Sequence, residues 1–192
     1  MTGGPVGQLA QALDLTGALV AGVGADQWAG PTPCDEWTVA DLVTHMVTGN
    51  YTFAAILRGT PLAEARTAAA RVAPGDDLAA HYRDAAAELI AAYGQPGVLE
   101  QLFTIPAGTM PGAGTLHVRL VEMLVHGWDL AQATGQATAF PDDLAEQELT
   151  FTRRQLGALP PGRSPFRPEQ PAAGDAPAIV RLVACLGRPV PG

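Results

Sequence analysis

The spacing of apolar residues restricts the fold more than any other feature of this sequence. Apolar side chains recur every three or four residues, as on one face of a helix, in five segments. These segments are 6–23, 38–59, 74–94, 114–134 and 140–159. The alternation typical of strands is almost absent, although the connection 95–114 leaves room for a short strand or a turn. The pattern predicts an all-α protein, and its long loops favour a helix bundle with a crossover connection.

Capping residues support these helices. Thr38 is a suitable N-cap, and Asp41 three residues later completes a capping-box variant. Gly59, Gly94 and Gly135 suit helix ends. The tail is rich in proline, with one short helix expected in 176–187. We therefore expect one domain, with a bundle over residues 1–160 and a C-terminal extension over 161–192 that packs on it.

Composition narrows the classes of partner. The chain has 192 residues and a formal net charge of −8, whereas a nucleic-acid-binding protein needs a basic surface. No apolar run approaches the ~20 residues that span a bilayer, and the N-terminus lacks a basic segment followed by an apolar one. We expect a cytoplasmic protein with no membrane or nucleic-acid partner. Dimerisation is compatible with the sequence but not fixed by it.

Three ionisable residues interrupt the apolar stretch EMLVHGWDLA, namely Glu122, His126 and Asp129. On a helix they share one stripe, and His45 adjoins the apolar face of an earlier helix. Buried ionisable groups are costly without partners. A divalent metal held by His45, Glu122 and His126 would satisfy them and leave one coordination position open. Zinc fits best, and nickel, iron and manganese accept the same ligands. Asp129, or the indole of Trp128, would orient His126 through its other ring nitrogen.

Simpler interpretations stay open. A Glu and a His four residues apart often form a solvated pair on a helix surface, and a histidine on an apolar face is usually a core residue. Cys34 is either a fourth ligand, a reactive thiol or a small loop residue, and a disulfide with Cys185 is compatible with the sequence. His81 and His117 do not share the stripe, so we leave them out of the site. A metal-free helical interaction module is the third alternative.

Two segments, PTPCDEWTVADLVTHMV and VEMLVHGWDLAQATG, resemble the DinB/YfiT-like metal-binding bundle superfamily. More narrowly, they resemble its mycothiol-dependent maleylpyruvate isomerase N-terminal-like branch, and the tail from Ser164 is similar to that of a smaller subfamily. The resemblance implies a four-helix core with a crossover. It also implies a metal bound by His45, Glu122 and His126.

The resemblance further implies thiol chemistry. Enzymes of this superfamily use the metal to hold a small thiol, such as mycothiol, as the thiolate that attacks an electrophile. Isomerases of the branch carry a further domain that helps to grip a dicarboxylate, and this chain ends before one would begin. We expect a thiol-dependent transferase or isomerase whose partners are a small-molecule thiol and an electrophile. The alternative is a non-enzymatic metal- or ligand-binding stress or sensor protein with the same site.

Overall fold

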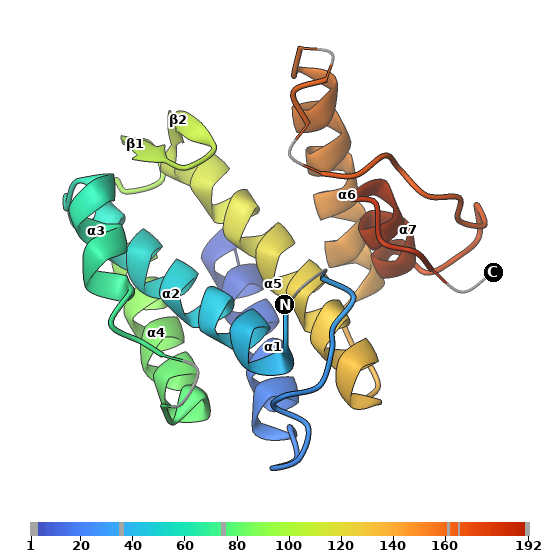
Figure 1. Cartoon of the computed structure of the whole chain (residues 1–192). Coiled ribbons are helices and arrows are strands. Elements are labelled where there is room, and N and C mark those ends of the chain that lie inside the picture. Colours follow the sequence, from blue (N-terminus) through green and yellow to red (C-terminus); the bar gives the residue numbers. More distant parts are fainter. Residues whose placement is uncertain (1–3, 35–36, 74–75, 161, 165, 191–192) are drawn as a thin grey trace.

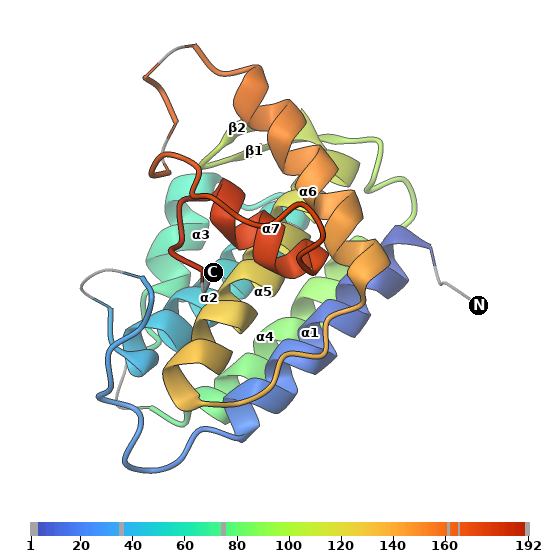
Figure 2. The same cartoon turned by 90° about the vertical axis from the view of Figure 1, so that its right-hand side faces the viewer.

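Four long helices build the centre of the molecule in a computed structural model that describes residues 4–34, 37–73, 76–160, 162–164 and 166–190. They are α1 (Pro5–Ala21), α2 (Val39–Leu57), α4 (Leu78–Tyr93) and α5 (Gly112–Thr134). Helix α1 packs against α4 and α5, and α2 packs against the same two helices. The consecutive helices α1 and α2 therefore lie at opposite corners, and the chain crosses one end of the bundle between them (Figures 1 and 2).

The remaining elements pack around α2 and α5. Helix α3 (Leu62–Ala69) packs on α2, whereas α6 (Asp142–Gly157) and α7 (Ala178–Cys185) pack on each other and on α5. Strands β1 (Leu102–Ile105) and β2 (Gly108–Pro111) form an antiparallel hairpin. Figure 1 shows α5 between α2 on one side and α6 on the other. This central position explains why α5 is buried along most of its circumference, polar residues included.

The all-α class predicted from the sequence is confirmed, since the only sheet among the described residues is this hairpin. The predicted helices are present within a few residues of their expected ends, although Pro74 and Gly75 of the third lie outside the described residues. Helix α3 was not predicted. Its buried side chains are Ala65 and Ala69, which are too small to give a recognisable apolar period. The connection after α4 forms the hairpin.

The capping box at the start of α2 is confirmed. The Thr38 side chain accepts a hydrogen bond from the backbone of Asp41, and the Asp41 carboxylate accepts one from the backbone of Thr38. The carboxylate also accepts a hydrogen bond from the Thr38 hydroxyl, and this bond, followed by the one from the Thr38 backbone, lowers the pKa of Asp41. The cap therefore fixes where α2 begins and which face carries His45.

Helices α1 and α5 approach closely at Gly127. A Cβ atom there would lie 2.5 Å from Cζ of Phe140 and 2.9 Å from Oγ1 of Thr16. The same threonine donates a hydrogen bond to the carbonyl of Met123. The missing side chain lets α1 pack tightly beside His126 and so fixes α5 at the site.

The helices that the structure describes include none with the length and apolar character of a membrane span.

Candidate metal centre

The three predicted ligands come together between α2 and α5. Nε2 of His45 lies 2.9 Å from Oε2 of Glu122, and Nε2 of His126 lies 3.5 Å from the same oxygen. All three donor atoms lie within 4.8 Å of one another. Residues 77 positions apart in the sequence thus place their polar atoms at one point of the helix interface.

These donors fit a divalent cation. Ligands bound tetrahedrally at about 2.0–2.1 Å lie about 3.3 Å apart, between the two distances seen here. Two imidazole nitrogens and one carboxylate oxygen are also a ligand set that leaves a position for a further group. Zinc, nickel, iron and manganese all accept ligands of these types. The side chains of His45 and Glu122 are 38% and 29% exposed, so a small molecule can reach the site.

His126 is oriented from its other side. Its Nδ1 lies 3.0 Å from Oδ2 of the fully buried Asp129, one turn further along α5. Arg188, in the tail after α7, contacts both carboxylate oxygens of Asp129. The contact of Asp129 with Nδ1 turns the ring of His126 so that Nε2 faces Glu122. Trp128 packs in the core instead, so Asp129 rather than the indole makes this contact.

A second group of potential ligands lies beside the first. Cys34, His126 and Asp129 are close enough to hold an ion, but Sγ of Cys34 is 3.1 Å from both a guanidinium nitrogen of Arg188 and Oδ2 of Asp129. The guanidinium already supplies the positive charge that these groups need. We therefore favour the group formed by His45, Glu122 and His126. Both cysteines are free, so the sequence alternative of a disulfide is not realised.

Opposite pKa shifts accompany these contacts in the metal-free protein. Burial opposes the ionised form of Glu122, but hydrogen bonds from His126 and His45 hold its pKa well below the usual value. Burial likewise opposes the charged form of His126, but hydrogen bonds to Asp129, Cys34 and Glu122 raise its pKa well above the usual value. Imidazolium and carboxylate thus neutralise each other where a cation would otherwise be held.

Arg119 is a site residue that sequence reasoning missed. It is fully buried on α5, donates a 2.7 Å hydrogen bond to Asn50, and has a nitrogen 3.8 Å from Glu122. Its Nε and Nδ2 of Asn50 have no hydrogen-bond partner among the described residues. The signal available in the sequence was an arginine three residues before Glu122 on an apolar helix.

Other residues considered from the sequence fall outside the cluster. His117 pairs with Glu148 of α6 at 2.8 Å, and His81 lies 3.8 Å from Asp76. Trp37, by contrast, packs its ring 4.8 Å from that of His45. The positions of His81 and His117 agree with leaving both out of the site. Trp37 packs beside the cluster of candidate ligands.

Two cavities meet at Glu122. One, of about 390 Å³, is lined by the polar side chains of His45, Thr48, Thr52, Arg66 and Arg119 and also by apolar ones, among them Phe53, Ile105 and Val118. We call it the polar cavity. The other, of about 340 Å³, lies between α5, α6 and the tail. The candidate metal centre therefore opens into two separate spaces of the size that small ligands occupy.

Comparisons with known proteins agree with this fold. The helices follow those of DinB-like proteins, as solved for a mycothiol-dependent maleylpyruvate isomerase. That crystal structure matches with a TM-score of 0.61 at 16% identity, over 76% of this chain and 66% of the isomerase, and a mutant of the isomerase matches equally well. Residues 9–131 match the model of the mycothiol maleylpyruvate isomerase N-terminal domain. The chain belongs to this family.

More similar sequences have no assigned activity. An uncharacterised protein of Mycobacterium tuberculosis is 38% identical over 185 residues, which cover 94% of this chain and 95% of the relative. A second uncharacterised protein of that organism is 34% identical over 139 residues, covering 62% of this chain and 51% of the relative. The first similarity extends through α6 and the tail, beyond the part that the family model matches.

Proposed function

We propose that this protein is a metal-dependent enzyme that uses a small-molecule thiol to attack an electrophile. The observation that carries the proposal is the convergence of His45, Glu122 and His126 on one point, with an open cavity on either side. Membership of the mycothiol maleylpyruvate isomerase family supports mycothiol as the thiol. Two reactions are compatible with this site. The thiol is either transferred to the electrophile or released again after it has catalysed an isomerisation of the electrophile.

The chain's own residues hold and orient the groups that react. His45, Glu122 and His126 would bind the metal, which when bound supplies a Lewis acid that keeps a thiol ionised at neutral pH. Asp129 fixes the tautomer and direction of His126. Arg119, which donates a hydrogen bond to Asn50, lies 3.8 Å from Glu122 and helps to position its carboxylate. The polar cavity, with two threonines and Arg66 in its wall, suits the hydroxyl-rich body of a sugar thiol.

The chemistry balances without a further reagent. In an addition to an activated double bond, sulfur forms a bond to the β-carbon, and the π electron pair moves to the α-carbon, which takes a proton from solvent. A transferase releases this product. In an isomerisation the adduct rotates about the new single bond, the α-carbon gives its proton back to solvent, and the electron pair left there re-forms the double bond as the thiolate leaves, so that the thiol is regenerated.

Accessibility favours this proposal over a binding-only sensor protein. A site that only stores or senses a metal is usually closed by a protein side chain. Here the side chains of His45 and Glu122 are 38% and 29% exposed. One cavity reaches both of them, and a second reaches Glu122. The convergence of three donor atoms also favours the proposal over a metal-free interaction module, which does not need such a cluster.

Elemental analysis of the purified protein tests the proposal directly. We expect about one equivalent of divalent metal in the wild type and in His81→Ala, a matched control because His81 lies on α4 outside the cluster. His45→Ala and His126→Ala should retain little metal. Equal metal content in all four proteins would overturn the site. Consumption of mycothiol with an electrophile, in the wild type but not in the two ligand variants, tests the reaction.

A further inference from the structure

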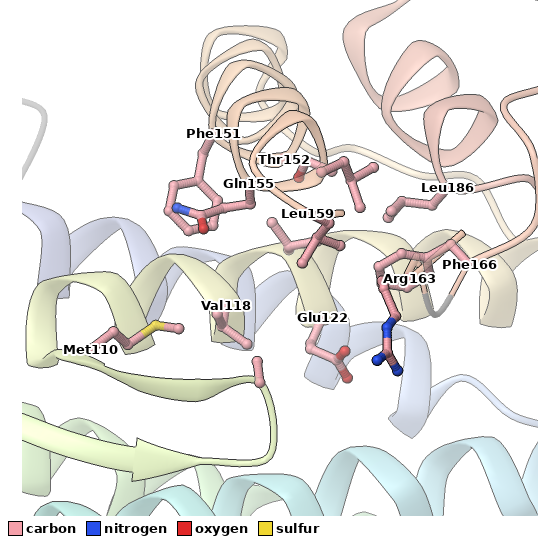
Figure 3. Close-up of a pocket in the computed structure, with 13 residues that line it drawn as sticks. Met110, Val118, Glu122, Phe151, Thr152, Gln155, Leu159, Arg163, Phe166 and Leu186 are labelled. Atoms are coloured by element: carbon pink, nitrogen blue, oxygen red, sulfur yellow. The ribbon is translucent and has the colours of Figure 1, made fainter. Parts of the chain in front are cut away.

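The second cavity at Glu122 is mostly apolar. Val118, Val121 and Glu122 of α5 form its floor, and side chains of α6, the hairpin and the tail form its walls. Figure 3 shows Met110, Val118 and Leu159 facing this space, with Glu122 at its edge. We call it the acceptor pocket. Its volume of about 340 Å³ lies at the lower end of the range for small-molecule sites.

The acceptor pocket leaves large apolar side chains in contact with water. Three such residues are clearly exposed among those that the structure describes: Leu102 at 69%, Leu159 at 40% and Phe166 at 38%. The last two both line this pocket. Exposed apolar surface that gathers in one concave place marks a binding site more often than scattered surface does. An apolar ligand would cover Leu159 and Phe166.

One buried polar group in this wall has no partner. Thr152 of α6 is 5% exposed, and its Oγ1 makes no hydrogen bond to any described residue. A buried hydroxyl without a partner costs free energy, and because Thr152 lies in the wall of the pocket, rotation of its side chain would bring Oγ1 to a ligand there. The occupant should therefore carry at least one oxygen on an otherwise apolar body.

We propose that the acceptor pocket binds the apolar body of the electrophile, a carbonyl compound with an alkyl or aryl tail, while the thiol occupies the polar cavity. This assignment rests on the proposed function and deepens it. Glu122, Val118 and Ala107 line both spaces, so reactants in them meet beside the metal ligands. Among the described residues that line the pocket, Arg163 is the one cationic side chain, and Figure 3 shows its guanidinium beside Glu122. A single positive charge suits one oxygen-bearing group on an apolar body better than a dicarboxylate, which needs a cationic partner at each end.

A chain-length series tests the proposal. The zinc-loaded protein would be given mycothiol and 2-alkenals of four to ten carbons, and kcat/KM measured for each. Each methylene that enters the pocket should raise kcat/KM about fourfold until the pocket is full. Turnover that does not depend on chain length would overturn the pocket assignment and leave the proposed function standing.

A charge at the pocket rim provides the matched variants. Leu159→Glu places a carboxylate where the alkyl tail should lie, and because Leu159 is partly exposed the fold should tolerate it. This variant should lose the length dependence. Leu102→Glu, an exposed leucine of β1 outside the pocket, should behave like the wild type. If both variants kept the length dependence, the assignment would be wrong.

Unreactive analogues separate the pocket from the reaction. Binding of 2-alkanones of the same lengths, measured by calorimetry, should tighten with length in the wild type and in Leu102→Glu but not in Leu159→Glu. That result without any turnover would support the pocket and contradict the proposed function. Absence of 2-alkanone binding at every length would overturn the pocket whatever the activity.

Discussion

Asp129 holds His126 from the side opposite the proposed metal, with Oδ2 3.0 Å from Nδ1. The carboxylate is fully buried and is itself fixed by Arg188. Burial opposes its ionisation, but hydrogen bonds from His126 and Arg188 lower the pKa of Asp129. Asp129 therefore accepts a hydrogen bond from the Nδ1–H of His126, so Nε2 is the nitrogen that can coordinate once it has lost its proton.

Asp129→Asn should weaken metal binding about ten- to hundredfold, the usual cost of losing a residue that orients a histidine ligand. Competition with a chromogenic chelator measures the affinity. Asp14→Asn, on the exposed side of α1, serves as the control and should bind metal like the wild type. An unchanged affinity in Asp129→Asn would show that Asp129 does not orient the ligand.

Metal binding should release protons near neutral pH. In the metal-free protein the pKa of His126 lies well above its usual value, so the ring is protonated there, whereas the lowered pKa of Glu122 leaves that group already ionised. A metal must displace the proton of His126, so the apparent affinity rises with pH until this pKa is passed.

Calorimetry in buffers of different ionisation enthalpy counts these protons. At pH 7 we expect about one proton per metal from His126, and fewer in Asp129→Asn because a bond that raises the pKa is lost. A binding enthalpy independent of the buffer would contradict the prediction.

Gly127→Ala should destabilise the protein by about 1–3 kcal/mol, the usual effect of inserting a methyl group into a packed interior. The new Cβ would contact Phe140 and Thr16 at 2.5 Å and 2.9 Å and push α1 away from α5 beside His126. Gly157→Ala is the control, since a Cβ there meets nothing within 4 Å, and it should be neutral or stabilising by up to about 1 kcal/mol. Urea unfolding of both variants measures the difference.

Thr152→Val should raise the free energy of unfolding by about 1 kcal/mol, because it replaces a buried hydroxyl without a partner by a methyl group. It should also weaken the binding of 2-alkanones about threefold to tenfold, through loss of one hydrogen bond. Thr67→Val on the exposed α3 removes a hydroxyl outside the pocket and should leave binding unchanged. Lower stability together with unchanged binding would contradict the role given to Thr152.

Much of the fold was predictable because its long helices follow a regular apolar period. Thr38 and Asp41 marked the start of α2 correctly, and Gly135, with φ of 70°, marks the end of α5 as expected. Helix α3 escaped prediction because alanine gives no clear apolar stripe. The sequence also gave no means of placing α6 and the tail against α5, since such packing depends on contacts between distant residues.

The candidate site was partly predictable for a similar reason. Glu122 and His126 are unusual on an apolar helix, and their spacing puts them on one stripe. His45 was selected as a partner from its position beside an apolar face and from family resemblance. Arg119 was missed although its position on an apolar helix, three residues before Glu122, was a usable signal, and Arg188 was missed because its place in a proline-rich tail gives none. Only the folded chain shows that Arg119 is buried under Glu122 and that the tail brings Arg188 to Asp129.

The outer wall of the acceptor pocket and the candidate metal ligands come from different parts of the chain. The three metal-binding candidates lie within residues 9–131, the part that the family model matches, while much of the wall comes from residues 151–186. Substitutions among residues 151–186 would therefore change the proposed pocket while leaving the three candidate ligands, and Arg188 beside Asp129, unaltered. Chimaeras that exchange this segment between relatives would show whether selectivity is inherited with the tail.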